Sequence, residues 1–283
     1  MLENKAEFVD LARGLLPATV DAGAVLMRYF QSGVTVERKA DDSPVTAADR
    51  EAEDVILSAL AVAAPGVPVV AEEQASAGNI PSIGDAFFLV DPLDGTRGFI
   101  KGRPSFTVNI GLVVRPYTRF GIIYAPASEQ MFVTLGPHEA VEMTVPAKKE
   151  SDVLTAFGQR QIHARPPEPD CLRVATSRYV SERFESQLQY LPEHHRLAMD
   201  SSIKFCLVAR GDAHIYPRFS EINEWDTAAG GAILQAAGGC VTDRAGARLT
   251  YGHADRHFRH SGFIAWGAPA PTGLLSALAD RAT

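Results

Sequence analysis

Asp91-Pro92-Leu93-Asp94-Gly95-Thr96 is the most informative stretch of the sequence, and it directly follows the apolar residues 87–90. The apolar run predicts a buried strand, so the two aspartates should lie at its end. Pro92 restrains the chain between them, and Gly95 permits a tight turn. Hard divalent cations such as Mg²⁺ prefer carboxylates, waters and substrate phosphate as ligands. The stretch therefore predicts a divalent-metal site.

Two further acidic clusters also lie at the ends of expected elements. Glu72 and Glu73 follow the apolar residues 67–71, and Asp226 lies at the start of a small-residue stretch that predicts a helix over 227–237. Taken alone, Asp226 reads equally well as an acid that caps this helix. Beside the other acids at element ends, a shared metal site is the better account. We expect Glu73 to support this site or to be solvated.

The composition is that of an ordinary globular protein. With 283 residues, 46% of them hydrophobic and 22% charged, the chain can form one or two domains with a large core. A net charge of −7 argues against a nucleic-acid polymer as partner. The three cysteines, Cys171, Cys206 and Cys240, include no CxxC pair, which argues against a disulfide framework or a zinc site.

Localisation is predicted from the same features. Acidic residues precede any apolar stretch near residue 1, so we expect no cleavable leader, and no apolar run is long enough to span a bilayer. The protein is expected in the cytoplasm, with a peripheral association with the inner membrane left open. The sequence does not fix the oligomeric state.

The first half of the chain is expected to mix helices and strands. Residues 3–30 have helical periodicity, and Pro17 predicts a break into two helices. Residues 34–39 predict a strand and residues 43–46 a turn, after which Thr46 caps a helix over 47–61. Asp49 falls in the first turn of that helix, where the dipole alone favours a carboxylate. Residues 106–114, 120–124 and 130–135 predict three antiparallel strands.

The second half reads as alternating α/β structure. Residues 162–170 are rich in proline and arginine and predict a connector. Beyond it we expect strands at 172–176, 203–209, 213–216 and 262–265, and helices at 181–190 and 227–237. This organisation predicts an α+β domain at 1–160, with most of the metal ligands, and an α/β domain at 161–283.

The motifs A-E-E, D-P-L-D-G-T and W-D-x-A-A-G occur in this order and resemble those of the inositol monophosphatase superfamily, across nearly the whole chain. The resemblance implies magnesium-dependent, lithium-sensitive phosphatases with a layered αβαβα sandwich, also found in fructose-1,6-bisphosphatase. It further implies two or three Mg²⁺ ions. The implied ligands of the first ion are Glu72, Asp91 and the carbonyl of Leu93, and those of the second are Asp91, Asp94 and Asp226.

Such a site is suited to phosphate ester hydrolysis by a metal-activated water. Two cations about 3.5–4 Å apart can clamp the attacking and leaving oxygens of an in-line displacement. Asp91 is the natural bridge because its turn is rigid. The family pattern pairs Thr96 with Asp49 to take the proton of the water. The N–H groups of Gly95 and Thr96 are expected to bind phosphate oxygens.

Substrate choice is expected to depend on the second domain. Ser201, Lys204 and Arg218 precede Asp226, and alone the two cations read as surface charges beside core strands. The pattern S-S-x-K-F-C-L-V-A-x-G…Y-P-R-F…W-D-T-A-A-G, with Ser43-Pro44-Val45-Thr46-Ala47-Ala48-Asp49, resembles the 3′(2′),5′-bisphosphate nucleotidase branch of the superfamily.

This branch removes the 3′-phosphate of adenosine 3′,5′-bisphosphate to give AMP and phosphate, a reaction of sulfur metabolism. Lys204 and Arg218 would then neutralise the 5′-phosphate, with Ser201 as a hydrogen-bond partner.

Two positions depart from the branch pattern. Arg97-Gly98 stands where the branch has a lysine and a glutamate, and Ser177-Arg178-Tyr179-Val180 stands where it has S-R-S-H. Val180 cannot donate a hydrogen bond, so a nucleotide contact is lost or supplied elsewhere. The alternative within the superfamily is an inositol monophosphatase or a fructose bisphosphatase. A non-catalytic regulator that binds RNA or protein is the alternative of another class, disfavoured by the full acid set and the lack of a basic stripe.

Overall fold

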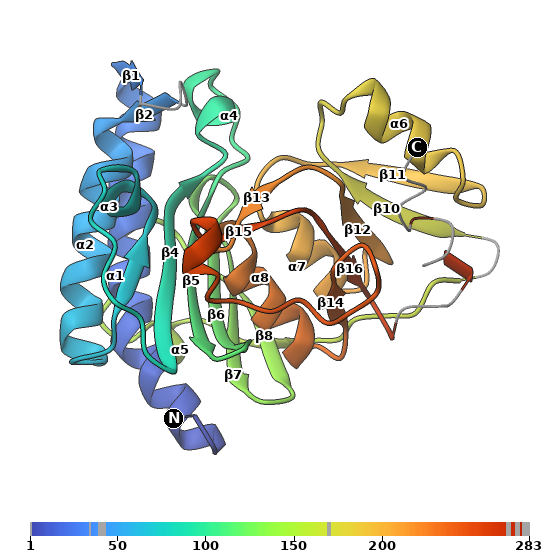
Figure 1. Ribbon diagram of the computed structural model, residues 1–283. Helices are drawn as coiled ribbons and strands as arrows, with labels where there is room; N and C mark the ends of the chain where they lie inside the picture. The colour runs from blue at the N-terminus through green and yellow to red at the C-terminus, as the bar shows by residue number, and fades with distance from the viewer. Residues whose placement is uncertain are drawn as a thin grey trace.

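Five layers stack in the order helix, sheet, helix, sheet, helix in the computed structural model, which describes residues 2–33, 35–38, 44–168, 171–269, 273, 274 and 278 (Figure 1). Helices α1 (Lys5–Ser32) and α2 (Ala47–Ala63) cover one face of a large sheet. Helices α7 (Ile203–Ala209) and α8 (Trp225–Ala236) lie between this sheet and a smaller one. Helix α6 (Glu182–Leu188) packs on the far face of the small sheet. The layered sandwich expected from the sequence is confirmed.

The large sheet has seven strands in the order β3-β4-β5-β6-β7-β8-β9. Strands β3 and β4 are parallel and all other neighbours are antiparallel, as predicted for the three central strands. The bounds are β3 Val69–Ala71, β4 Ala86–Asp94, β5 Thr107–Val114, β6 Tyr117–Ala125, β7 Gln130–Gly136, β8 Glu139–Thr144 and β9 Arg160–Ile162.

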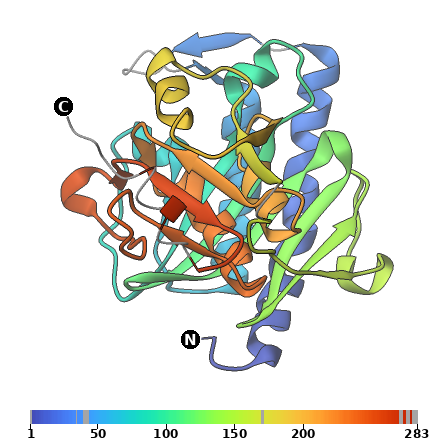
Figure 2. The same ribbon diagram turned by 90° about the vertical axis from the view of Figure 1, so that its right-hand side faces the viewer.

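The small sheet has five strands in the order β11-β10-β12-β16-β14, and in Figure 2 it lies in front of the large sheet. Their bounds are β10 Leu172–Thr176, β11 His194–Ala198, β12 Ile215–Arg218, β14 Cys240–Thr242 and β16 Phe263–Trp266. The division into domains at residue 160 stays a prediction. The remaining elements are β1 Val36–Arg38, β2 Pro44–Thr46, α3 Glu72–Ser76, α4 Thr96–Ile100, η1 Pro126–Ser128, α5 Val153–Ala156, β13 Ile222–Asn223, η2 Ala254–Arg256 and β15 Arg259–His260.

Two predictions of secondary structure were wrong, one of a break in a helix and one of a strand. Pro17 does not divide the first helix, because α1 continues through it with buried residues on both sides, among them Leu16 and Val20. Packing against the sheet therefore outweighs the lost hydrogen bond. Residues 203–209 form α7 and not a strand. All seven side chains are buried, so the run carries no periodicity from which the two structures could be told apart.

Two predicted boundaries also changed. Strand β4 does not end at Val90 but continues to Asp94 through a register shift. Pro44, Val45 and Thr46 form β2 and not a turn, while Ser43 lies outside the described residues, as do Val34 and Lys39 of the neighbouring predicted strand.

Two glycines allow α8 to lie close against the large sheet. Gly111 of β5 and Gly121 of β6 are directly opposite each other in the sheet. A Cβ atom at Gly111 would lie 2.7 Å from the Cβ of Ala228, and one at Gly121 would lie 2.2 Å from the carbonyl oxygen of Ala229. The paired glycines therefore set the distance between the sheet and the helix that carries Asp226.

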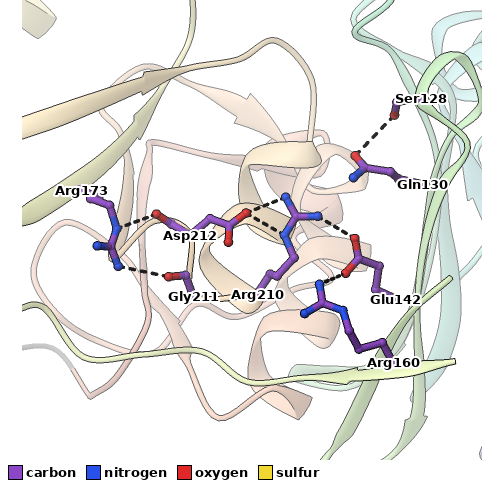
Figure 3. Close-up of polar contacts among 8 residues, drawn as sticks. All are labelled: Ser128, Gln130, Glu142, Arg160, Arg173, Arg210, Gly211 and Asp212. Atoms are coloured by element: carbon purple, nitrogen blue, oxygen red, sulfur yellow. Dashed lines mark hydrogen bonds and ion pairs between the residues drawn. The ribbon is translucent and has the colours of Figure 1, made fainter. Parts of the chain in front are cut away.

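An ion-pair network joins the large sheet to the C-terminal end of α7 (Figure 3). Arg210 donates to Glu142 of β8 at 2.6 Å and to Asp212 at 2.7 Å. Arg160 of β9 also donates to Glu142.

No helix in the described part of the chain has the length and apolarity that a membrane span requires.

We predict that Gly121→Ala destabilises the protein. The added methyl group meets the backbone of α8, and overpacking of this kind costs about 1–3 kcal/mol. Urea unfolding measures the change. Gly84→Ala is the matched control, because a Cβ there meets no atom within 4 Å. Equal stability of the two variants would contradict the close packing of α8.

Candidate active site

A bulge in β4 presents two carboxylates from one strand. Asp91 is opposite Asn109 and Asp94 is opposite Thr107, with a register shift between the two pairs. The backbone N–H of Leu93 donates to Oδ1 of Asp91 at 3.0 Å and fixes the side chain inside the bulge. Asp91 is buried, and Asp94 is partly accessible. The rigid presentation expected from Pro92 thus comes from a bulge within the strand.

Asp226 completes the acidic cluster from the other side. One carboxylate oxygen from each of Asp91, Asp94 and Asp226 lies within 4.8 Å of the other two. The N-cap of α8 is Glu224, so the alternative that Asp226 is the N-cap is wrong. Its Oδ2 nevertheless accepts the backbone N–H of Asn223 at 3.2 Å. Three of the predicted metal ligands are therefore brought together.

Burial and mutual repulsion raise the pKa values of this cluster. Desolvation, followed by the charges of Glu72, Asp94 and Asp226, raises the pKa of Asp91 well above its ordinary value. Desolvation and the charges of Asp94 and Glu72 raise the pKa of Asp226 to about 8. Desolvation also raises the pKa of Asp94, although Lys204 and Arg218 oppose the shift. A cation between the carboxylates would remove the repulsion.

Glu72 lies beside this cluster, at the start of α3, but outside the group of three within 4.8 Å. Its position depends on Glu53, a buried residue of α2 that the sequence analysis did not single out. Glu53 accepts the backbone N–H groups of Glu73 and Gln74 at 2.8 and 3.0 Å, which caps α3 from a distant helix. The available signal was the spacing of four residues from Asp49, which places both acids on one face of α2.

Asp49 has two sets of partners. In the predicted cap of α2, its Oδ2 accepts the backbone N–H of Thr46 at 2.8 Å and the hydroxyl of Thr46 at 2.7 Å. Its Oδ1 lies 3.4 Å from the hydroxyl of Thr96, which also lies 3.0 Å from the carbonyl oxygen of Leu93. Asp49 therefore completes the capping box of α2 and also contacts Thr96, while its catalytic role stays a prediction.

Glu224 anchors the start of α8. This fully buried carboxylate accepts the backbone N–H of Gly252 at 2.7 Å and that of His253 at 2.9 Å. It also pairs with Nδ1 of His253 at 2.7 Å. A ring nitrogen of His260 lies within 4.8 Å of the same group. Because the carboxylate already has these three partners, we interpret the cluster as a support that holds Asp226 in place.

A cavity of about 430 Å³ opens beside the acids. Of the predicted site residues, Asp94, Gly95, Ser201, Lys204, Arg218 and Asp226 line it. Five cationic and three acidic side chains contribute to its wall: Arg97, Lys101, Arg103, Lys204 and Arg218 against Asp94, Asp200 and Asp226. An anionic ligand therefore fits this cavity, the more so with metal ions on the acids.

Lys204 is not a surface charge, so that alternative was wrong for Lys204, whereas Arg218 is half-buried. Lys204 is 3% exposed, donates to the carbonyl of Ser201 and lies 5.1 Å from the ring centroid of Tyr216. Burial, assisted by Arg218 and opposed by Asp94, lowers its pKa to about 8. The Nε atom of Arg218 is buried and has no hydrogen-bond partner within the described part of the chain. Both cations are thus available to a ligand.

The comparisons with known proteins agree with this arrangement. A family model described as inositol monophosphatase family matches residues 10–265. Two proteins named 3′(2′),5′-bisphosphate nucleotidase CysQ, from Salmonella typhimurium and Escherichia coli K12, are each 40% identical over 233 residues, covering 82% of this chain and 89% of the relative. The crystal structure of CysQ from Bacteroides thetaiotaomicron superposes with a TM-score of 0.75 at 29% identity, covering 92% of this chain and 97% of that one.

We predict that stabilisation by a divalent metal grows with pH. The folded pKa of Asp226 is about 8 against 3.8 for a free side chain, so its contribution to stability is present below about pH 4 and is lost as the pH rises through 8. A bound cation relieves this loss because it binds the ionised form. The difference between melting temperatures with Mg²⁺ and with EDTA should increase from about pH 5 to pH 8. In Asp226→Asn this increase should be smaller. A difference that does not change with pH would contradict the repulsion.

Proposed function

Because the chain belongs to the inositol monophosphatase family, we propose that it is a metal-dependent 3′(2′),5′-bisphosphate nucleotidase that converts adenosine 3′,5′-bisphosphate to AMP and phosphate. One observation carries the proposal beyond the family. The acidic cluster and the cations Lys204 and Arg218 line the same cavity. A substrate with two phosphates can therefore place one on the metals and the other on the cations.

The acidic cluster fits Mg²⁺ by its chemistry. Its donors are all oxygens, and its carboxylates raise one another's pKa values in a way that a cation would reverse. Asp91, Asp94 and Asp226 would hold one ion, and Glu72, Asp91 and the Leu93 carbonyl another. Bound Mg²⁺ would supply Lewis-acid stabilisation of the charge on the reacting phosphate. Inhibition by lithium, a cytoplasmic location and a place in sulfur metabolism belong to the same proposal.

Thr96 and Asp49 together accept the proton that the attacking water loses. The hydroxyl of Thr96 has one hydrogen and two possible acceptors, the Leu93 carbonyl at 3.0 Å and Asp49 at 3.4 Å. If the carbonyl serves as a metal ligand, the hydrogen turns to Asp49. The hydroxyl oxygen then accepts a hydrogen bond from the water. As the water gives its proton to this oxygen, the hydroxyl proton of Thr96 moves to the carboxylate of Asp49.

The second phosphate binds where Lys204 and Arg218 line the cavity. Lys204 and Arg218 come from α7 and β12 and supply charge and hydrogen-bond donors there. A monophosphate would leave Lys204 and the buried Nε of Arg218 without a phosphate partner, so it should bind more weakly. Ser201, buried beside them, adds a hydroxyl. Gly95 and Thr96 contribute backbone N–H groups to the reacting phosphate.

A substrate panel with Mg²⁺ tests the proposal directly. Adenosine 3′,5′-bisphosphate should be turned over with a much higher kcat/KM than inositol 1-phosphate or fructose 1,6-bisphosphate. A preference for either sugar phosphate would assign the protein to another activity of the family. Measurable magnesium-dependent phosphate release would eliminate a non-catalytic regulator as the sole function.

We predict that Thr96→Ala lowers kcat by about 10²–10⁴-fold, the usual contribution of proton transfer. Thr96→Ser keeps the hydroxyl and should retain most of the activity. Asp49→Asn should show a similar loss, and the double variant should be little worse than either single variant because the two side chains act as a unit. Melting temperatures control for the role of Asp49 in capping α2. Fully additive losses would refute the pairing.

We further predict that Lys204→Met and Arg218→Met each raise KM for adenosine 3′,5′-bisphosphate by about ten- to a hundred-fold, with a smaller effect on kcat. Methionine keeps most of the volume and removes a charge-assisted hydrogen bond worth roughly 1.5–3 kcal/mol. Adenosine 3′-monophosphate, which lacks the 5′-phosphate, is the control and should respond little to either change. Equal losses on both substrates would mean that these cations contact the reacting phosphate.

A further inference from the structure

A second cavity, of about 250 Å³, lies against α8 and is formed by residues of β6, α8, β14 and the segment 248–251. We call it the distal cavity, because no described residue that lines it also lines the reaction cavity. Cavities that hold drug-sized ligands measure roughly 300–1,000 Å³, so this one suits a smaller molecule. Gly231 lines it and lies about 140° around α8 from Asp226. A molecule bound in the distal cavity therefore contacts a different face of α8 from the reacting phosphate.

Gly231 leaves open space in the wall of the distal cavity. A Cβ atom at this position would lie 3.0 Å from the hydroxyl oxygen of Tyr251, 3.6 Å from that of Thr118 and 3.8 Å from Cγ2 of Val241. These side chains thus converge on the place that a side chain at Gly231 would occupy. The residue lies within α8, where alanine is the more stable choice by propensity. The missing side chain therefore leaves room that a ligand can fill.

The hydroxyl of Tyr251 is a buried polar group without a bond. Tyr251 is 4% exposed, and its hydroxyl makes no hydrogen bond within the described part of the chain. The neighbouring hydroxyl of Thr227 donates its own hydrogen to the carbonyl oxygen of Glu224 at 3.0 Å. A buried hydroxyl in this state gains stability when a ligand forms a hydrogen bond with it. The backbone N–H of Tyr251 donates to the carbonyl oxygen of Pro116 at 2.9 Å, which fixes the segment that presents the ring.

Of the described residues that line the distal cavity, only Arg248 is charged. Its guanidinium carbon lies 3.7 Å from the ring centroid of Tyr117, and its Nη2 donates to Oε1 of Gln235 at 2.6 Å. These two contacts hold the guanidinium group in one orientation. The side chain is exposed, so an anion can reach it from solvent. Because the planar guanidinium matches a carboxylate in shape, a carboxylate is the anion that fits it best.

The remaining walls limit the charge and the size of the ligand. Val241, Leu249 and the ring of Tyr117 present apolar surface. One arginine beside apolar walls suits a single negative charge, whereas a phosphate or a nucleotide would need more positive charge or more polar partners. We propose that the distal cavity binds a small monocarboxylate with an apolar body and a hydroxyl group. Its carboxylate pairs with Arg248, and its hydroxyl bonds to Tyr251 in the space beside Gly231.

Calorimetry with 3- and 4-hydroxybenzoate tests the carboxylate. At least one of the two acids should bind saturably, about ten- to a hundred-fold more tightly than the matching hydroxybenzamide, because the amide carries no charge. Arg248→Gln should weaken binding of the acid by a similar factor. Lys204→Met removes a cation from the reaction cavity and should leave the affinity unchanged. Absence of saturable binding for both acids, or weakening by Lys204→Met and not by Arg248→Gln, would overturn the proposal.

Gly231→Ala tests the location of the ligand. The added methyl group occupies the space among Tyr251, Thr118 and Val241, so it should weaken binding of the acid by about ten-fold or more. Alanine is favoured in a helix, so the variant should unfold at the wild-type urea concentration or above it. Gly84→Ala, which meets no atom, is the matched control and should bind as the wild type does. Unchanged affinity in a stably folded Gly231→Ala would show that the acid binds elsewhere.

Tyr251→Phe tests the hydroxyl of the ligand. This change removes one oxygen and should weaken binding of the hydroxybenzoate by about two- to ten-fold, the usual contribution of a neutral hydrogen bond. Benzoate, which has the carboxylate but no hydroxyl, should bind equally well to the wild type and to Tyr251→Phe. An equal loss for both acids, or no loss for either, would overturn the assignment of the hydroxyl.

Discussion

Repulsion among Asp91, Asp94 and Asp226 is the constraint on which the arrangement of the site depends. Their carboxylate oxygens lie within 4.8 Å of one another, and desolvation adds to the cost of ionising them. Side chains in this situation would move apart if the backbone allowed it. The bulge of β4 holds the first two, and α8, packed against Gly111 and Gly121, brings the third to them. The folding free energy of the layers thus holds the three carboxylates together despite their repulsion, which a bound cation would remove.

The sequence predicted that Asp91, Asp94 and Asp226 lie together, because each acid belongs to a short local motif. Asp91 and Asp94 lie in one short string, and Asp226 in another, each beside residues that indicate an element end. The supporting residues leave no such local signal. Glu53 accepts a hydrogen bond from Glu73 of α3, which is 20 residues away in the sequence. Glu224 accepts one from Gly252, which is 28 residues away. Residues 203–209 were misassigned because a run buried on all sides lacks periodicity.

Structural and functional roles coincide at several of these residues. Asp49 caps α2 with one oxygen and faces Thr96 with the other. Asp226 accepts a backbone N–H at the start of α8 and belongs to the acidic cluster. A carboxylate has two oxygens and about four acceptor sites, so one role does not exclude the other. At Asp49, a structural role in the capping box is therefore compatible with a functional role beside Thr96.

The elements that hold the acids differ from those that line the rest of the cavity. Asp91 and Asp94 belong to β4, whereas Lys204 comes from α7 and Arg218 from β12. Asp94 and Asp226 belong to the acidic cluster and also line the cavity with Lys204 and Arg218. Substitutions around the small sheet can therefore change which phosphate ester fits without disturbing the bulge that presents the acids. Conversely, a change in β4 would affect every substrate alike, because the reacting phosphate is common to all of them.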